Sequence, residues 1–486
     1  MSKYLDQSIL VIHELLKSKK IKPIDLVLEA YERIEENKGL NLFITLNKEE
    51  ALKEAKLLED MEVDNLLFGI PIALKDNIVT KDLKTTCASL MLANFMPIYD
   101  ASVVSKLKKR HMIVIGKTNM DEFAMGSSSR TSYFGAPHNP WNIEKVTGGS
   151  SGGSAGVVAA RIVPFALGSD TGGSIRQPAS YCGIVGMKPT YGRVSRYGLV
   201  AFASSLDQIG PMTRNVYENA LLLNAIVGMD SKDLTSVSLE KEDFTRFIGE
   251  DICGMKIGVP KYFMSDIVSI EIKEKMENVF SLLKEAGCIV EYIDISYIEQ
   301  AARLYQVIAM GEASSNLARF DGIRYGYSCK DPKDIDDLYY RSREEGFGEE
   351  VKRRIMVGSY LLSGENAKKY YDKAMSVRSD IRTSFLEAFK KYDLLVGPTT
   401  VSCACDIAED MSDPLKGFMD DVLVIPVNMA GLPGLSLPIG FSKEDMPIGM
   451  HIMANDFDEA TIYKLASFIE EKLALDLCPR GGNYHE

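Results

Sequence analysis

The sequence predicts a single α/β domain in which helices cover both faces of a twisted sheet. Short apolar runs bounded by turn residues alternate with segments of helical periodicity, and this alternation is typical of an α/β architecture. Hydrophobic residues make up 46% and charged residues 26% of the chain, which excludes a largely disordered protein. No internal repeat or low-complexity linker divides the sequence, so we expect one extended domain over residues 1–486.

The elements that support this fold class follow one another along the chain. Helical periodicity or a helix-start signal predicts helices at 6–18, 23–36, 100–110, 154–162, 216–228 and 271–287. Apolar runs between turn residues predict buried strands at 66–75, 112–117, 163–170, 255–260, 288–293 and 393–398. A charged stretch over 325–375 is more continuously helical, and we expect it to form a cap or lid.

Charge and cysteine content restrict the classes of function. The 56 basic and 68 acidic residues give a net charge of −12, which makes the chain a poor candidate for binding nucleic acid alone. The eight cysteines are scattered without a CxxC pair, which indicates reduced thiols in a cytoplasmic protein. No apolar stretch approaches the roughly 20 residues that span a bilayer, so no membrane contact is expected. No His, Cys and carboxylate cluster has metal-ligand spacing, so no metal is expected.

Two Gly/Ser-rich segments, 146–156 and 167–180, are embedded among apolar residues. A flexible linker would not lie between a buried strand and an Ala/Val-rich helix. We therefore expect ordered loops, in which glycine brings backbone N–H groups close to a ligand or a reacting group.

Two other kinds of site fit these segments poorly. Gly116-Lys117-Thr118 resembles the end of a phosphate-binding loop, but His111 stands where that loop needs glycine. Ser151 matches the centre of a serine-hydrolase elbow, which needs a later histidine as its base. Only His451, in a strand-like pattern, and His485, near the end of the sequence, follow it.

Lys75 stands at the end of an apolar run, where a polar loop begins. Partial burial there would lower its pKa and allow it to act as a neutral general base. A nucleophilic serine needs such a base, and a tetrahedral intermediate needs N–H donors, which the segment 171–174 (TGGS) could supply. A surface lysine, or an ion-pair partner of Asp76, remains the alternative at this point.

Lys75, the loop 148–154 (GGSSGGS) and the segment 168–180 (GSDTGGSIRQPAS) together resemble the amidase signature family, and they occur in its order. The resemblance implies an α/β/α sandwich with a large mixed, twisted central sheet. Its signature core would cover about 66–211 and its helical cap about 297–390. It also implies a Ser–cis-Ser–Lys triad, with Ser174 as the acyl-forming nucleophile, Ser150 as the relay and Lys75 as the base. The oxyanion hole would be formed by the N–H groups of Thr171, Gly172, Gly173 and Ser174.

Further segments extend the resemblance to essentially the whole chain and are similar to the glutaminase subunits of tRNA-dependent amidotransferases within that family. These segments are 188–214, 312–326, 346–356 and 425–440. The resemblance implies hydrolysis of glutamine to glutamate and ammonia. Arg354 would bind the α-carboxylate of glutamine and Asp421 its ammonium group, with Tyr305 in the same pocket. The neighbouring Arg353 and Asp420 remain alternatives for these two roles.

The same resemblance implies a heterotrimer with subunits B and C. The B subunit would hold most of Glu-tRNA(Gln) and use ATP, Mg²⁺ and the ammonia to form Gln-tRNA(Gln), so no cofactor is expected in this chain. Two alternatives are a stand-alone amidase for small aliphatic or aryl amides, which would share the triad, and a non-catalytic subunit.

The sequence departs from the usual family pattern at 129–132, which reads SRTS rather than TENS, at 363–373, and at Val424. We expect the first of these segments to lie near the pocket. Asp170 and Arg176, which flank the nucleophile, are expected to brace its loop through buried polar contacts.

Overall fold

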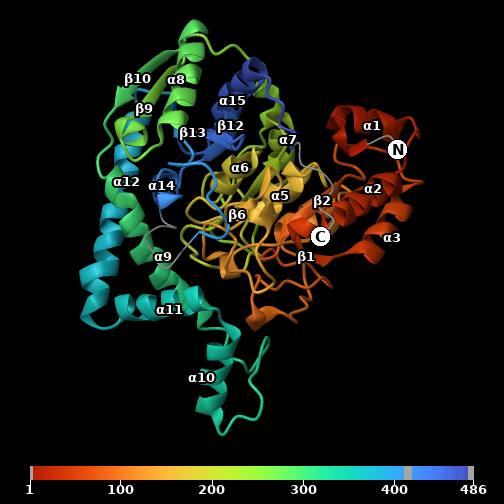
Figure 1. Ribbon diagram of the computed structural model, residues 1–486, viewed down its shortest axis with the longest axis vertical. Helices are drawn as coiled ribbons and strands as arrows, with labels where there is room; N and C mark the ends of the chain where they lie inside the picture. The colour runs from red at the N-terminus through yellow and green to blue at the C-terminus, as the bar shows by residue number, and fades with distance from the viewer. Residues whose placement is uncertain (1–3, 410–418, 480–486) are drawn as a thin grey trace.

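The computed structural model describes residues 4–409 and 419–479, which form an α/β/α sandwich around one large sheet (Figure 1). Within those residues the sheet has eleven strands, in the order β1-β3-β2-β6-β8-β7-β12-β13-β11-β9-β10. They are β1 Phe43–Leu46, β2 Pro71–Lys75, β3 Ile113–Thr118, β6 Phe165–Asp170, β7 Val185–Lys188, β8 Gln208–Thr213, β9 Lys256–Pro260, β10 Ile289–Ile293, β11 Leu394–Pro398, β12 Gly434–Phe441 and β13 Pro447–Met453. A separate hairpin joins β4 His138–Asn139 to β5 Asn142–Val146.

The sheet is mixed, as predicted. β2 lies parallel to both β3 and β6, and β9 lies parallel to both β11 and β10. The strands between these two groups pair antiparallel. β2 and β6 end side by side, so the residues after both strands meet at one edge of the sheet.

Helices cover the sheet, and two pairs of them pack on its middle strands. α5 contacts α6, while α7 contacts α15. The helices are α1 Ile9–Lys17, α2 Pro23–Glu36, α3 Lys48–Leu58, α4 Ser102–Lys108, α5 Gly152–Ala159, α6 Arg176–Cys182, α7 Val216–Ile226, α8 Ile270–Glu285, α9 Ala301–Leu317, α10 Ile335–Gly346, α11 Glu349–Leu362, α12 Lys373–Phe389, α14 Ile425–Ala430 and α15 Glu459–Leu473. No helix in the described part of the chain is both long and apolar enough to cross a membrane.

The six predicted strands and six predicted helices are all present, with boundaries that shift by a few residues. The strand at 288–293 is not buried as predicted, because β10 lies at the edge of the sheet, where its residues are exposed or half-buried. The largest correction concerns the strand predicted at 66–75, which begins only at Pro71. Before it the chain turns, because the Asn65 side chain accepts a hydrogen bond from the Leu67 N–H and Gly69 has a φ of +72°. The sequence alone did not separate this turn from the apolar run that follows.

The stretch predicted as continuously helical over 325–375 is interrupted. Its first residues form a loop, and α10, α11 and the π-helix η8 Ala367–Asp372 then follow in succession. α10 extends away from the rest of the molecule, whereas α11 packs against α9 (Figure 1). α11 is the element that carries Arg353 and Arg354.

Candidate active site

Lys75 is the last residue of β2 and is completely buried. Its Nζ donates hydrogen bonds to Ser150 Oγ at 2.7 Å and to the Ser169 carbonyl at 3.2 Å. Burial lowers the pKa of Lys75 to about 7, against the opposing charges of nearby aspartates, of which Asp121 has the largest effect. The surface-lysine alternative is therefore excluded, and Lys75 can be neutral near physiological pH.

Ser150 lies in the loop between β5 and α5, and the peptide bond that joins it to Gly149 is cis. A Cβ at Gly149 would lie 2.1 Å from Asp121 Oδ2 and 2.7 Å from the backbone nitrogen of Ser128, so only glycine fits there. The Asp121 N–H donates to the Ser150 carbonyl at 3.3 Å. These contacts hold the Ser150 backbone against the loop that follows β3.

Ser174 lies in the turn between β6 and α6, and its carbonyl accepts a hydrogen bond from the Ser151 N–H at 3.1 Å. The two Gly/Ser loops are thus neighbours in space. Ser174 is 5% exposed and lines a cavity, so a small ligand can reach it. The structure therefore brings the three predicted triad residues to one edge of the sheet.

Two glycines before Ser174 allow later parts of the chain to approach its loop closely. A Cβ at Gly172 would lie 2.6 Å from the Tyr305 ring. At Gly173, where φ is +134°, a Cβ would lie 2.6 Å from Asp421 Oδ1. Any side chain at either position would displace a residue that lines the cavity.

Asp170 and Arg176 brace the nucleophile loop, as predicted. The Asp170 carboxylate accepts hydrogen bonds from the N–H groups of Gly173 at 2.8 Å and Ile175 at 3.1 Å, and from Arg176 Nε at 3.0 Å. Burial opposes ionisation of Asp170, but the Arg176 charge holds its pKa below the ordinary value. The oxyanion prediction needs one correction, because the Gly173 amide is directed at Asp170. Thr171, Gly172 and Ser174 remain as predicted donors.

The structure excludes the two other kinds of site. Ser151 is buried and its hydroxyl donates to the Ser169 carbonyl at 3.0 Å. His451 Nε2 lies 3.0 Å from a guanidinium nitrogen of Arg176, and burial holds the pKa of His451 well below its ordinary value. His485 lies outside the described residues. Lys117 is buried and donates to Thr85 Oγ1 at 2.9 Å, so it stabilises the core rather than a phosphate loop.

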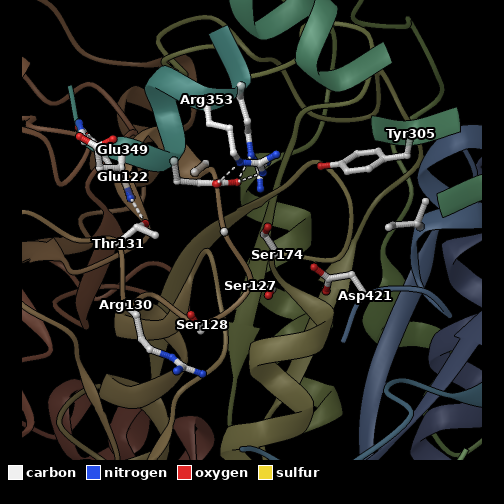
Figure 2. A pocket seen from close by; sticks show the side chains of 16 residues that line it. Glu122, Ser127, Ser128, Arg130, Thr131, Ser174, Tyr305, Glu349, Arg353 and Asp421 are labelled. Carbon is white, nitrogen blue, oxygen red and sulfur yellow. Dashed lines mark hydrogen bonds and ion pairs between the residues drawn. The ribbon is translucent and has the colours of Figure 1, made fainter. Parts of the chain in front are cut away.

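The cavity beside Ser174 has a volume of about 640 Å³, and Figure 2 shows the side chains that surround it. It opens between the nucleophile loop, the loop after β3, α9, the start of α11 and the residues before α14. The lining residues are Glu122, Ala124, Gly126, Ser127, Ser128, Arg130, Thr131, Ser174, Tyr305, Gly348, Glu349, Glu350, Arg353, Arg354, Asp421 and Ile425. Among residues 4–409 and 419–479, no group of three or more His, Cys, Asp or Glu side chains is arranged to hold a metal ion.

Both candidate arginines reach this cavity from α11. Arg354 is 6% exposed, its guanidinium lies 5.6 Å from the centre of the Phe202 ring, and its Nε donates to Glu350 at 2.6 Å. Arg353 is half-buried and donates to both carboxylate oxygens of Glu350, at 2.7 and 2.8 Å. The greater burial of Arg354 favours it as the reader of a ligand carboxylate, because desolvation strengthens such a pair.

Asp421 lines the same cavity, and Figure 2 shows it on the other side of Ser174 from Arg353. Its Oδ1 atom is buried, and no hydrogen bond from the described residues reaches it. Burial, together with the charges of Asp420 and Asp170, raises the pKa of Asp421 well above its ordinary value. Asp420 instead accepts a hydrogen bond from the Tyr181 hydroxyl at 3.2 Å. A ligand ammonium group would satisfy Asp421 and favour its ionised form.

The departing segment 129–132 lies at the cavity, as predicted, with Arg130 and Thr131 in its lining. Two carboxylates at the cavity, Glu122 and Glu350, were not predicted. Glu122 lies between Asp121 and a short apolar run, and Glu350 lies among charged residues, and neither pattern by itself indicates a functional residue. The contact of Glu122 with Gly348, 226 residues away, and the pairing of Glu350 with Arg353 and Arg354 are visible only in the structure.

Comparison with known proteins places the chain in a family. The Amidase family model matches residues 25–463. A relative from Pediococcus pentosaceus, described as the A subunit of glutamyl-tRNA(Gln) amidotransferase, is 52% identical over 471 residues, which cover 96% of this chain and 97% of the relative.

Solved structures agree with this relationship. The crystal structure of the glutamyl-tRNA(Gln) amidotransferase A subunit from Thermotoga maritima is 39% identical with a TM-score of 0.80, covering 99% of this chain and 97% of that one. A bacterial aryl acylamidase is 25% identical with a TM-score of 0.84, covering 96% of each chain. The chain therefore belongs to the amidase signature family and, within it, to the family of glutamyl-tRNA(Gln) amidotransferase A subunits.

Proposed function

We propose that this chain is the glutaminase subunit of a tRNA-dependent amidotransferase and hydrolyses glutamine to glutamate and ammonia. One observation carries the proposal: the Lys75–Ser150 hydrogen bond lies next to a cavity that contains Ser174, two arginines and a carboxylate oxygen that no described residue reaches by a hydrogen bond. The first feature is suited to amide hydrolysis. The second is suited to an amide that also bears a carboxylate and an ammonium group.

In the proposed reaction, Ser174 Oγ attacks the side-chain carbonyl carbon of glutamine. Ser150 accepts the proton of Ser174 while its own proton passes to neutral Lys75 Nζ, 2.7 Å away. The carbonyl oxygen becomes an oxyanion, which the amides of Thr171, Gly172 and Ser174 stabilise. When the C–N bond breaks, the proton returns along the same path to the leaving nitrogen, which departs as ammonia.

Water then attacks the glutamyl ester on Ser174. The same relay removes a proton from the water and returns one to Ser174 Oγ, which releases glutamate and restores the free serine. The buried position of Lys75 supports this cycle, because a fully solvated lysine would be protonated at neutral pH and could not accept the first proton.

Substrate selection rests on charge. Arg354 would pair with the α-carboxylate of glutamine and Asp421 with its ammonium group, while Tyr305 borders the nucleophile loop between them. A simple aliphatic or aryl amide offers neither charge, so it would leave both of these groups without their ligands.

The proposed assembly is a heterotrimer with subunits B and C. Two of the relatives named above, from Pediococcus pentosaceus and Thermotoga maritima, are described as A subunits of glutamyl-tRNA(Gln) amidotransferase, which supports such an assembly. The B subunit would bind Glu-tRNA(Gln), use ATP and Mg²⁺, and consume the ammonia. This chain itself would need no cofactor.

The proposal is tested by measuring ammonia release from glutamine and from aryl amides, with the chain alone and with candidate subunits B and C. We expect glutamine to be the preferred substrate of the complex. Efficient turnover of aryl amides by the isolated chain, with no turnover of glutamine by the complex, would instead identify a stand-alone amidase. If Ser174 resists labelling by a serine-directed probe in every preparation, the chain is a non-catalytic subunit.

A further inference from the structure

Glu122 is a buried carboxylate at the edge of the cavity to which the proposed reaction assigns no role. It is 3% exposed and lies in the loop after β3. Its two oxygens accept hydrogen bonds from the Gly348 N–H, at 3.1 and 2.9 Å, and Ser89 Oγ donates to one of them. Glu122 and Gly348 are 226 residues apart in sequence, so this contact joins two distant parts of the fold.

Gly348 is the residue immediately before α11, the helix that carries Arg353 and Arg354. The first N–H groups of a helix have no acceptor within the helix and are usually capped by a nearby side chain. Gly348 has no side chain with which to cap α11. The Glu122 side chain approaches this end instead and accepts a hydrogen bond from the Gly348 N–H.

The fit between the two residues is close. A Cβ at Gly348 would lie 2.3 Å from Glu122 Oε2, so the contact requires glycine at this position. Ser89 Oγ, which donates to Glu122, also lies 3.2 Å from the Gly346 carbonyl. Ser89 and Glu122 therefore both pack against the chain just before α11.

Asp121, the residue before Glu122, contacts the loop that carries Ser150. The Asp121 N–H donates to the carbonyl of Ser150, and the Asp121 carboxylate accepts the Ser129 N–H at 2.8 Å. Asp121 therefore contacts the triad loop, while Glu122 contacts the helix of the substrate-binding arginines. Two consecutive residues join the two halves of the site.

We propose that Glu122 is a positioning residue that sets the distance between Arg354 and the triad by anchoring the start of α11 to the loop beside Ser150. This inference rests on the proposed function, because it assumes that Arg354 binds the substrate carboxylate. Glu122 itself does not contact the reacting atoms. Its removal should weaken glutamine binding and leave the reactivity of Ser174 intact.

The test compares Glu122→Ala and Glu122→Gln with the wild-type chain in the assembled complex. We expect Glu122→Ala to raise the KM for glutamine at least about tenfold, with kcat reduced less than about threefold. The rate at which a small, uncharged serine-directed electrophile labels Ser174 should stay within about threefold of wild type. Glu122→Gln keeps an oxygen that can accept a hydrogen bond from the Gly348 N–H, so we expect its KM to lie much closer to the wild-type value than that of Glu122→Ala.

Asp336→Ala is the matched control. Asp336 is an exposed acidic residue in the first turn of the preceding helix, α10, and it does not line the cavity. We expect its KM to stay within about twofold of wild type. A second variant, Gly348→Ala, pushes the helix away from Glu122 and should reproduce the KM increase if Glu122→Ala does not fold.

Two results would overturn the inference. One is an unchanged KM in folded Glu122→Ala and Gly348→Ala. The other is an equal loss of kcat, KM and Ser174 labelling, which would indicate general damage rather than positioning. Failure of the proposed function is distinguishable from both, because the wild-type complex would then release no ammonia from glutamine.

Discussion

The two walls of the cavity are built differently. The reaction wall is formed by Ser174, in the turn after β6, with Lys75 at the end of β2 and Ser150 in the loop before α5 behind it, and all three residues are buried. The recognition wall consists of Tyr305, α11 and Asp421, which come from much later in the chain. Its Arg353–Glu350 pair is partly exposed. The residues that carry out the reaction and those that bind the substrate thus come from different elements of the fold. We therefore expect substitutions on the reaction wall to lower kcat and substitutions on the recognition wall to raise KM.

The most severe change on the reaction wall is Ser174→Ala. Without the nucleophile no acyl-enzyme can form, and we expect kcat for glutamine to fall by about 10⁴-fold or more. Mass spectrometry of the protein after exposure to a serine-directed probe should show no adduct. A residual glutaminase activity above a few per cent would show that another residue carries the reaction.

The relay is tested by Lys75→Ala, Ser150→Ala and the double variant. Each single change should lower kcat by roughly 10³-fold or more, and the double variant should be little worse than either, because residues that act as one unit are not additive. Single-turnover acylation rates measure this directly. Losses that multiply would argue against one proton path through both residues.

The pH dependence of kcat reports the base of the reaction wall. Burial lowers the pKa of Lys75 to about 7, and only the neutral amine accepts a proton. As the pH falls below this value, kcat should decrease about tenfold per pH unit, and above it kcat should level off. The ammonium and carboxylate groups of glutamine keep most of their charge between about pH 5.5 and 7.5, so a flat profile in that range would contradict Lys75 as the base.

On the recognition wall, Arg354→Ala should raise the KM for glutamine by about 10- to 100-fold, since a charge-assisted hydrogen bond to a buried partner contributes roughly 1.5–3 kcal/mol. Labelling of Ser174 by an uncharged electrophile should be preserved. Arg353→Ala is the matched comparison, and its smaller effect would follow from its greater exposure. If Arg353→Ala raised the KM more than Arg354→Ala does, Arg353 rather than Arg354 would be the residue that binds the α-carboxylate of glutamine.

The sequence indicated residues of both walls but not the contacts that position them, for a physical reason. Lys75, Ser150 and Ser174 each lie in a short motif, and close contacts require the glycines beside the two serines. The contact of Glu122 with Gly348 spans 226 residues and leaves no local signal. The Gly173 amide was assigned to the oxyanion hole because the sequence does not reveal that Asp170 accepts from it.

The strands of the sheet also show that local sequence does not reveal long-range contacts. Strands with continuous apolar runs, such as β6 and β11, were predicted within two residues of their observed start. β8 was missed, because Gly210 and Pro211 give it low strand propensity. It nevertheless lies between β6 and β7, completely buried, where pairing with its neighbours determines its conformation.

The smallest expected effect concerns Arg130, a residue of the cavity lining in the segment 129–132. Its guanidinium donates to the carbonyls of Ile407 at 3.2 Å and Glu409 at 2.8 Å and contacts Cys405 Sγ at 3.1 Å. These bonds connect the loop after β3 to the segment 405–409, rather than presenting a charge to a ligand. Because the site is partly exposed, water can replace much of what is lost, and we expect Arg130→Ala to raise the KM about two- to fivefold, or roughly 0.5–1 kcal/mol.

The kcat of Arg130→Ala should be unchanged, because none of these bonds of Arg130 reaches the triad. Arg130→Lys separates charge from geometry: a lysine keeps the charge but cannot donate in two directions from a planar fork. If the contacts to the two carbonyls are what matters, Arg130→Lys should resemble Arg130→Ala in steady-state kinetics with glutamine. If Arg130→Lys behaves as wild type while Arg130→Ala does not, the positive charge itself acts on the substrate, and Arg130 belongs to the recognition wall.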